Sequence, residues 1–332
     1  MEKGKLSERI LERSVLKQLQ GQKGLEGILT KMAAGGDFAA LNMEEEEALV
    51  TAVASVSSDI EDIGRLAVIK ASNNVAVSGA DQAGIMLDIL LPPDTEESRL
   101  KFLIKQAALT AKELETVIIG GHTEITDSVR LPVITATGIG RVKRSMLLGK
   151  GSSRPGDDIV MTKWIGLEGS AFIVKERKEE LKARFTPALI ESLEDMSKEL
   201  SIIKEARICR ENMVHEMHDL SSGGVFAGLW ELSKASGLGL VADLKKIDIR
   251  QETVELCEYF KINPYELKSS GSLLFTTDRG YEVVERLKEA KIRATVIGKL
   301  TDNKDRIIVN EDEERYLDSP RGDEWDKVMT GG

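Results

Sequence analysis

The chain has 332 residues, which exceeds the size at which one hydrophobic core keeps growing, so two domains are the first expectation. Hydrophobic residues make up 41% and charged residues 31%, as in globular proteins, and no apolar run reaches the roughly 20 residues that a membrane-spanning helix requires. The net charge of -10 argues against nucleic acid as a partner, because binding it needs a basic face.

The first residues, MEKGKLSERILERSVLKQL, alternate charged residues with Leu, Ile and Val at helical spacing. They predict a helix and lack the uninterrupted apolar segment of a signal peptide, so we expect a cytoplasmic protein. The acidic run from Glu44 to Glu47 suits either a cation site or the solvated tip of a hairpin. Cys209 and Cys257 are isolated in the sequence, which favours two buried small side chains over a disulfide or a zinc site.

The first half of the chain alternates apolar segments with helical patterns. Apolar segments at 48–56 and 80–92 flank the helical pattern IEDIGRLAVIKASNNVAVSG, and Pro92-Pro93 ends the second segment. A longer helix is predicted at about 95–114, where apolar side chains recur at three- and four-residue intervals. VIIGG and LPVITATGIGRV then predict two more strands.

A turn-rich segment, GKGSSRPGDDIV at 149–160, separates two regions of similar element content. We therefore expect domains at 1–148 and 149–332. In the second domain, IVMTKWIG predicts a strand and 176–206 a charged helical region, and strands and helices remain mixed to the end. The expected fold class is therefore α/β (α+β). Later candidates are the strands GLVADLKKI, SLLFTT and RATVIGKL and the helices at 251–260 and 280–290.

The segment VHEMHDLSSGGVFAGLWELSKASG, at 214–237, places glycine and polar residues directly before a helical pattern that a further glycine ends. This helix is predicted to begin after Gly223-Gly224, with Ser221 or Ser222 as candidate N-cap. Free backbone N–H groups at a helix start can receive a phosphate or carboxylate group. An ordinary capped helix after a tight turn is the alternative interpretation.

Two polar residues precede this turn, and they are the candidate catalytic residues. His218 can donate a hydrogen bond or transfer a proton near neutral pH, and Asp219 follows it directly. A structural histidine remains the alternative.

Two other glycine pairs stand beside polar residues in the first half of the chain. In IIGGHTEIT, at 118–126, a predicted strand ends in two glycines and is followed by groups that can coordinate a metal or bind phosphate. In AAGGDFAAL, at 33–41, two glycines precede an aspartate. Neither segment has the lysine of the Walker phosphate loop, which excludes that chemistry. The residues concerned are Gly35, Gly36, Asp37, Gly120, Gly121, His122, Thr123 and Glu124.

Taken together and in order, these segments resemble the aminoimidazole ribonucleotide (AIR) synthase superfamily, which includes thiamine-monophosphate kinase, selenophosphate synthetase and the hydrogenase maturation protein HypE. The resemblance is greatest to HypE and the AIR-synthase-related proteins. The motifs that carry it cover nearly the whole chain: GKLS, GGDFAAL, DIGRLAVIKASNNVAVSGA, VIIGGHTEIT, TGIGR, PGDDIVMTKWIGLEGSA, MHDLSSGGVFAGLWELSKASGLGL and SSGSLLFTT.

The resemblance implies a two-domain fold in which the N-terminal sheet joins its copy in a second subunit to form a dimeric barrel. The C-terminal domain should be an α/β layer, with ATP between the domains and its phosphates held through Mg2+ by acidic side chains. Family enzymes phosphorylate a substrate, and several thereby activate an amide or carboxamide oxygen for loss as phosphate. Metal and backbone donors would stabilise the charge on the transferred group.

The same resemblance assigns residues to roles. His218 and Asp219 would lie on the substrate side. Nucleotide binding would fall to Gly35, Gly36, Asp37, Gly120, Gly121, Thr123, Ser221, Ser222, Gly223 and Gly224. The metal would be held by Asp37, Asn74, His122 and Glu124.

Several positions depart from the family pattern. Ala54, Asn74 and His122 stand where the relatives have aspartate, and neutral ligands hold Mg2+ less well than carboxylates do. Ser270 replaces a common glutamate, and the chain ends DEWDKVMTGG where HypE proteins end in a cysteine that carries the carbamoyl group.

Two functions are therefore open. One is an ATP-dependent phosphoryl-transfer or dehydratase-type enzyme that acts on an oxygen of a small molecule or peptide. The other is a catalytically impaired homologue that serves as a nucleotide sensor or assembly scaffold.

Overall fold

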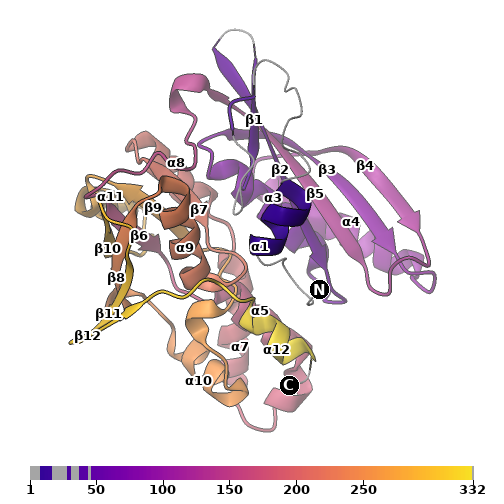
Figure 1. Ribbon diagram of the computed structural model, residues 1–332. Coiled ribbons are helices and arrows are strands. Elements are labelled where there is room, and N and C mark those ends of the chain that lie inside the picture. The colour runs from indigo at the N-terminus through magenta and orange to yellow at the C-terminus, as the bar shows by residue number, and fades with distance from the viewer. Residues whose placement is uncertain (1–7, 17–27, 31–36, 44–45, 331–332) are drawn as a thin grey trace. The chain divides into compact units, whose positions relative to one another are not determined.

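The computed structural model describes residues 8–16, 28–30, 37–43 and 46–330, which form two compact units (Figure 1). The N-terminal unit comprises the described residues 28–30, 37–43 and 46–147. The C-terminal unit comprises 8–16 and 148–330. Both units mix helices with a sheet, which confirms the expected α/β class.

The N-terminal unit is a five-stranded sheet with its helices on one side. The strand order is β1-β2-β5-β3-β4, in which the β3–β4 pair is parallel and the other pairs are antiparallel. The strands are β1 (Ala39–Asn42), β2 (Glu47–Ser57), β3 (Asp81–Leu91), β4 (Ile118–Ile125) and β5 (Val133–Lys143), and the helices are α3 (Ile63–Ala76) and α4 (Glu97–Glu113).

The two faces of this sheet differ in burial. Side chains alternate along β2, so that Ala48, Val50 and Ala52 are buried beneath α3, which in turn packs against α4. The opposite face, which we call the open face, carries Val53 and Met86 at 58% and 45% exposure. Among the described residues of this unit, no helix therefore covers the open face.

Strand β4 is longer than predicted. The expectation that this strand ends at its two glycines is wrong, because β4 continues to Ile125. The continuation follows from pairing with β3, whose register runs from Ile85 opposite Ile118 to Leu91 opposite Ile125. His122, Thr123 and Glu124 thus lie in a strand and not in a loop.

The C-terminal unit is built on a seven-stranded mixed sheet with the order β12-β11-β8-β10-β6-β9-β7. The strands are β6 (Asp158–Thr162), β7 (Glu216–Asp219), β8 (Gly239–Asp243), β9 (Leu273–Thr277), β10 (Ala294–Thr301), β11 (Arg306–Asn310) and β12 (Glu313–Tyr316). The helices are α1 (Glu8–Leu11), α5 (Leu167–Glu176), α6 (Lys178–Leu181), α7 (Pro187–Asp195), α8 (Ile203–Glu211), α9 (Gly224–Ser236), α10 (Gln251–Phe260), α11 (Gly280–Glu289) and α12 (Glu324–Thr330).

The core of this unit lies between the sheet and α9. Leu229 and Leu232 of α9 pack with Ile159 and Met161 of β6 in one buried cluster. Every residue of β6 and β9 is buried, as expected for central strands that are covered on both faces. None of the helices in the described ranges combines the length and apolar character needed to cross a membrane.

The cysteine expectation is confirmed. Cys209 and Cys257 are both free thiols and both buried. Burial raises the pKa of the Cys257 thiol to about 12, with a smaller contribution from the charge of Glu324. Both residues therefore act as small apolar side chains.

Several elements differ from the predicted ones. The region 176–206 contains three α-helices, and Pro187 starts the second of them after the N-cap Thr186. The strands β1, β7, β11 and β12 and the helices α5 and α12 have no predicted counterpart. Strand β7 illustrates the reason: its sequence EMHD has one apolar residue, yet all four residues are buried.

Candidate functional site

The start of α9 does not have the predicted serine cap. Its N-cap is Gly223, which lies in the left-handed region with φ 81° and has no side chain that could bond to the helix. The expectation that Ser221 or Ser222 caps this helix is therefore wrong. The Ser221 carbonyl instead accepts bonds from Gly224 N at 3.3 Å and Ser269 N at 3.2 Å, which fixes the turn.

The backbone N–H at this helix start is occupied by a carboxylate of the chain itself. Gly223 N donates to Asp323 Oδ2 at 2.6 Å, and the other oxygen, Oδ1, accepts from Trp325 N at 2.9 Å and Lys268 N at 3.3 Å. Burial raises the pKa of Asp323, while the charge of Lys268 and these backbone bonds lower it. A carboxylate thus binds where the sequence predicted an anionic ligand.

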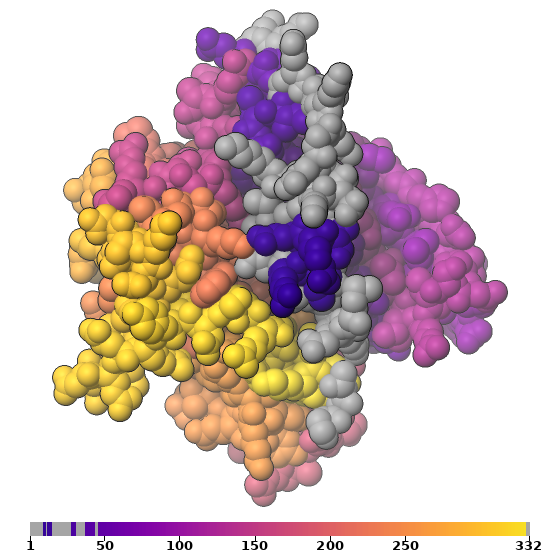
Figure 2. Space-filling view, in the orientation of Figure 1, coloured from indigo at the N-terminus to yellow at the C-terminus, as the bar shows by residue number. Residues whose placement is uncertain are grey.

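The segment that carries Asp323 lies along the surface of the C-terminal unit. In Figure 2 the yellow C-terminal residues lie at the surface beside orange residues, and the bond from Lys268 N to Asp323 joins the segment to the residues before β9. The segment also lines a cavity of about 510 Å³ together with Gly223, Phe226 and Arg315. The Phe226 ring stacks on Tyr265 with centroids 5.2 Å apart, so this aromatic face is already covered.

The candidate catalytic residues His218 and Asp219 are enclosed. They end β7, and only 5% and 2% of their surfaces are exposed. His218 Nε2 lies 3.1 Å from Glu231 Oε2 on α9, and His218 Nδ1 lies 3.4 Å from Lys150 Nζ. Both ring nitrogens therefore have a charged neighbour within the protein.

A buried glutamate, which sequence reasoning missed, lies two residues before His218. Glu216 Oε2 accepts bonds from Gly151 N at 2.9 Å and from the Ser153 hydroxyl at 2.8 Å. Burial raises the pKa of Glu216, and the two hydrogen bonds oppose this shift. A charged residue in a short strand gives no sequence signal of burial, because β7 lacks apolar alternation.

The raised pKa of Glu216 leads to a testable pH dependence. A carboxyl whose pKa is higher in the folded state binds its proton more tightly there. The contribution of Glu216 to the free energy of unfolding is present at pH values below its pKa in the unfolded chain, about 4.5. It is lost as the pH rises through its higher pKa in the folded chain. We expect Glu216→Gln to remove this decline in the free energy of unfolding, as measured by urea titrations across a pH series.

The matched control is Glu313→Gln on the exposed strand β12, which should leave the pH profile unchanged. Identical pH profiles for the Glu216→Gln variant and the unmodified chain would contradict the assignment.

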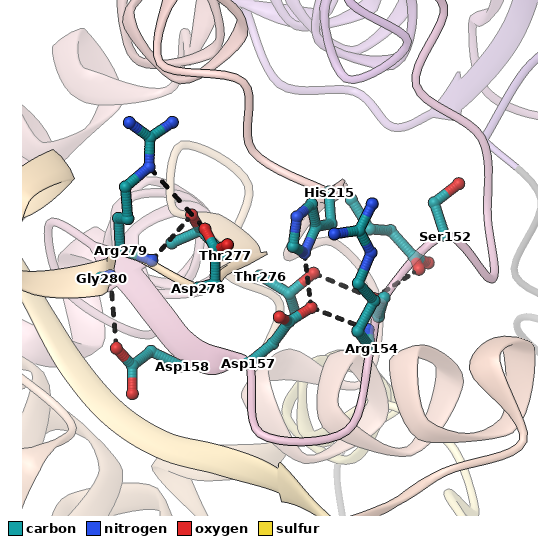
Figure 3. A network of polar contacts seen from close by, with 12 residues as sticks. Ser152, Arg154, Asp157, Asp158, His215, Thr276, Thr277, Asp278, Arg279 and Gly280 are labelled. Carbon is teal, nitrogen blue, oxygen red and sulfur yellow. Dashed lines mark hydrogen bonds and ion pairs between the residues drawn. The ribbon is translucent and has the colours of Figure 1, made fainter.

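The third histidine belongs to a polar network that anchors the loop before β6 (Figure 3). His215 Nδ1 lies 2.7 Å from Oδ2 of the buried Asp157, which also accepts the Arg154 N–H at 2.7 Å. The next residue, Asp158, accepts from Gly280 N at 3.2 Å. These contacts tie the loop to β7 and to the start of α11.

In the N-terminal unit, the open face of the sheet carries a polar row. The cross-strand register places Ser55, Thr135, Asp88 and His122 side by side on four strands. The hydroxyls of Ser55 and Thr135 are 2.8 Å apart, which confirms that they share this face. Glu124 continues it, because His122 Nε2 lies 3.3 Å from Glu124 Oε2.

The predicted metal ligands are only partly brought together. His122 and Glu124 are adjacent, but Asn74 lies on α3, which packs against the opposite face of the sheet, and Asp37 precedes β1. Among the described residues, no three His, Cys, Asp or Glu side chains are placed to hold a metal ion. One carboxylate beside an imidazole does not fit Mg2+, which prefers several oxygen ligands.

The predicted nucleotide-binding glycines have different surroundings. A Cβ at Gly121 would lie 1.9 Å from the Leu87 carbonyl oxygen, whereas a Cβ at Gly120 would meet no atom within 4 Å. Thr123 is opposite Ile89 in the register and faces away from His122. Gly35 and Gly36 lie outside the described residues.

Comparison with known proteins gives matches over both halves of the chain. Residues 35–142 match the family "AIR synthase related protein, N-terminal domain" and residues 154–310 match "AIR synthase related protein, C-terminal domain". A putative hydrogenase expression/formation protein of Methanocaldococcus jannaschii is 26% identical, over 98% of this chain and 97% of that protein. The carbamoyl dehydratase HypE of Cupriavidus necator is 28% identical over 64% of this chain and 59% of its own.

Solved structures share the fold. A HypE–HypF complex aligns with a TM-score of 0.77 at 23% identity, covering 93% of this chain and 99% of that chain. The hydrogenase maturation protein HypE in complex with ATP aligns with a TM-score of 0.68 at 18% identity, covering 96% of each chain.

Proposed function

The chain belongs to the AIR synthase-related family, and from this premise we propose that it binds ATP and transfers a phosphoryl group to an oxygen of a small molecule or peptide. The observation that carries the proposal is the match of both family domains together with the fold shared with an ATP complex of HypE. Like the substrate of a carbamoyl dehydratase, the substrate would carry an oxygen atom that can accept the phosphoryl group.

The residues that would serve this function are the two glycine pairs, Gly35-Gly36 and Gly120-Gly121, and the polar row. Backbone N–H groups of these glycine pairs would hold phosphate oxygens, as Gly223 N holds Asp323 at the start of α9. Because the described side chains do not fit a magnesium site, no step is assigned to a protein-bound Mg2+. Asp37 remains the proposed carboxylate beside the nucleotide phosphates.

We also propose that the chain forms a homodimer through the open face of the N-terminal sheet. Val53 and Met86 are large apolar side chains that project from this face into solvent. Large apolar side chains that are exposed together on one face of a sheet are typical of a protein–protein contact. A second copy would bury these side chains.

The function is tested by titrating ATP into the protein with and without Mg2+ and then measuring phosphate release. We expect binding and turnover, and we expect Asp37→Asn to weaken ATP binding by about tenfold, because an amide attracts a phosphate-bound cation less than a carboxylate does. Asp94→Asn, in the turn between β3 and α4, is the control and should bind ATP like the unmodified chain.

The possible outcomes separate the two functions. Binding with phosphate release supports the enzyme. Binding without release supports the nucleotide sensor. A protein that binds no ATP under either condition would leave only the assembly scaffold.

A further inference from the structure

Lys150 contacts a buried histidine, and its charge also acts on the buried Glu216. Its ammonium group lies 3.4 Å from His218 Nδ1, and His218 Nε2 lies 3.1 Å from Glu231 Oε2. Lys150 itself is half-buried, whereas His218 is almost fully buried. The three side chains form a continuous line from α9 through β7 to the loop that precedes β6.

The order of donors along this line follows from chemistry. A lysine ammonium group can only donate, so the His218 Nδ1 that it approaches must be the unprotonated acceptor. The imidazole proton then resides on Nε2 and is directed to the Glu231 carboxylate. His218 is thus the middle member of the line and orients its neighbour.

The backbone beside Lys150 is fixed independently. Gly151 N donates to Glu216 Oε2 at 2.9 Å, and Gly151 has φ 84°. A Cβ at Gly151 would lie 2.8 Å from the Ala235 carbonyl oxygen, so the loop is pressed against the end of α9. Fixing both the backbone and the long side chain of a lysine costs conformational entropy, which is expected where a preorganised charge serves a ligand.

We propose that Lys150 is the ligand-facing cation of the C-terminal unit, that His218 and Glu231 are positioning residues for it, and that it binds a phosphate group of the ligand. This inference deepens the proposed function and rests on it for the nature of the ligand. It also changes the role of His218, which orients Lys150 and does not itself transfer a proton. The phosphate group could belong to ATP or to a phosphorylated substrate or product.

Substitutions at His218 distinguish its contact with Lys150 from its contact with Glu231. In the Asn variant, the amide oxygen lies close to the Nδ1 position of the imidazole and can still accept a hydrogen bond from Lys150. In the Gln variant, the amide group reaches the Nε2 position, so it can donate to Glu231 but leaves Lys150 without its acceptor. We therefore expect His218→Asn to retain most of the phosphate binding and His218→Gln to lose it.

The experiment measures the affinity for inorganic pyrophosphate and for ATP by calorimetry, together with thermal unfolding. We expect Lys150→Met and His218→Gln to weaken pyrophosphate binding by about ten- to a hundredfold, the range for a lost charge-assisted contact. Lys150→Arg should restore binding to within a few-fold, and Glu231→Gln should be intermediate. The control is Lys245→Met, at an exposed lysine paired with Glu311, which makes the same change in charge.

Each outcome is decisive. The inference fails if Lys150→Met binds pyrophosphate as the unmodified chain does, even where ATP binding and turnover stand. Pyrophosphate binding that depends on Lys150 in a protein without ATP binding would keep the inference and remove the proposed function. If the unmodified chain binds neither compound, both fail. If Lys150→Arg and His218→Asn lose affinity as much as the other variants, in step with lost thermal stability, the line of contacts is structural only.

Discussion

Gly121→Ala is expected to destabilise the protein by about 3 kcal/mol or more, while Gly120→Ala, one residue earlier, changes the free energy of unfolding by less than about 0.5 kcal/mol. The two glycines are neighbours in the same strand and were both predicted to bind nucleotide. Gly121 has φ 153°, and its Cβ would lie 1.9 Å from the Leu87 carbonyl oxygen. Gly120 has open space at the Cβ position.

The clash at Gly121 can be relieved only by separating β4 from β3, which breaks the parallel pairing of this edge strand. Urea unfolding measures the loss of stability, and amide hydrogen exchange in β4 shows whether the pairing is lost. Equal stability of the two variants would contradict the close approach of β3 and β4. Because Gly120→Ala is expected to leave the fold intact, it is also the variant with which a role of this glycine pair in ATP binding is measured.

Asp323→Ala is expected to cost about 2 kcal/mol of stability, because three backbone N–H groups lose their acceptor at once. Those groups belong to Gly223, Lys268 and Trp325, so the substitution loosens the start of α9 and the attachment of the C-terminal segment together. Asp323→Asn keeps an acceptor oxygen and should cost about half as much.

The matched control is Asp318→Ala in the same segment, which lies at an exposed position and should change stability by less than about 0.5 kcal/mol. Urea unfolding at neutral pH distinguishes the variants. Equal effects at the two positions would mean that the carboxylate contributes no more than an ordinary surface charge.

The sequence predicted the repeating elements of the fold well. Helix α4 was expected at about 95–114 and is found at Glu97–Glu113, because its apolar side chains recur at helical spacing. Gly237 ends α9 as expected, in the left-handed conformation with φ 70°. These features depend on local patterns, which a single sequence displays in full.

The contacts of the candidate site could be predicted from the sequence less well than its helices and strands. Glu231 contacts His218, and Glu216 holds the loop beside Lys150 through Gly151 N, yet neither glutamate stands out in the sequence, because buried and exposed glutamates look alike there. Asp323 follows Gly223 by 100 residues and still bonds to it. In the sequence, Lys150 is one residue of a turn-rich segment and carries no motif of its own.

The sequence by itself determined the fold class, the family resemblance and the set of chemically able residues, because these depend on composition, periodicity and motif order. Only the tertiary structure decided which of those residues meet. It placed His122 and Glu124 on one face of a sheet and Asn74 on the helix that covers the other face, and it enclosed His218 between Lys150 and Glu231. Such contacts are set by strand register and by the packing of segments far apart in the chain, which local sequence patterns do not encode.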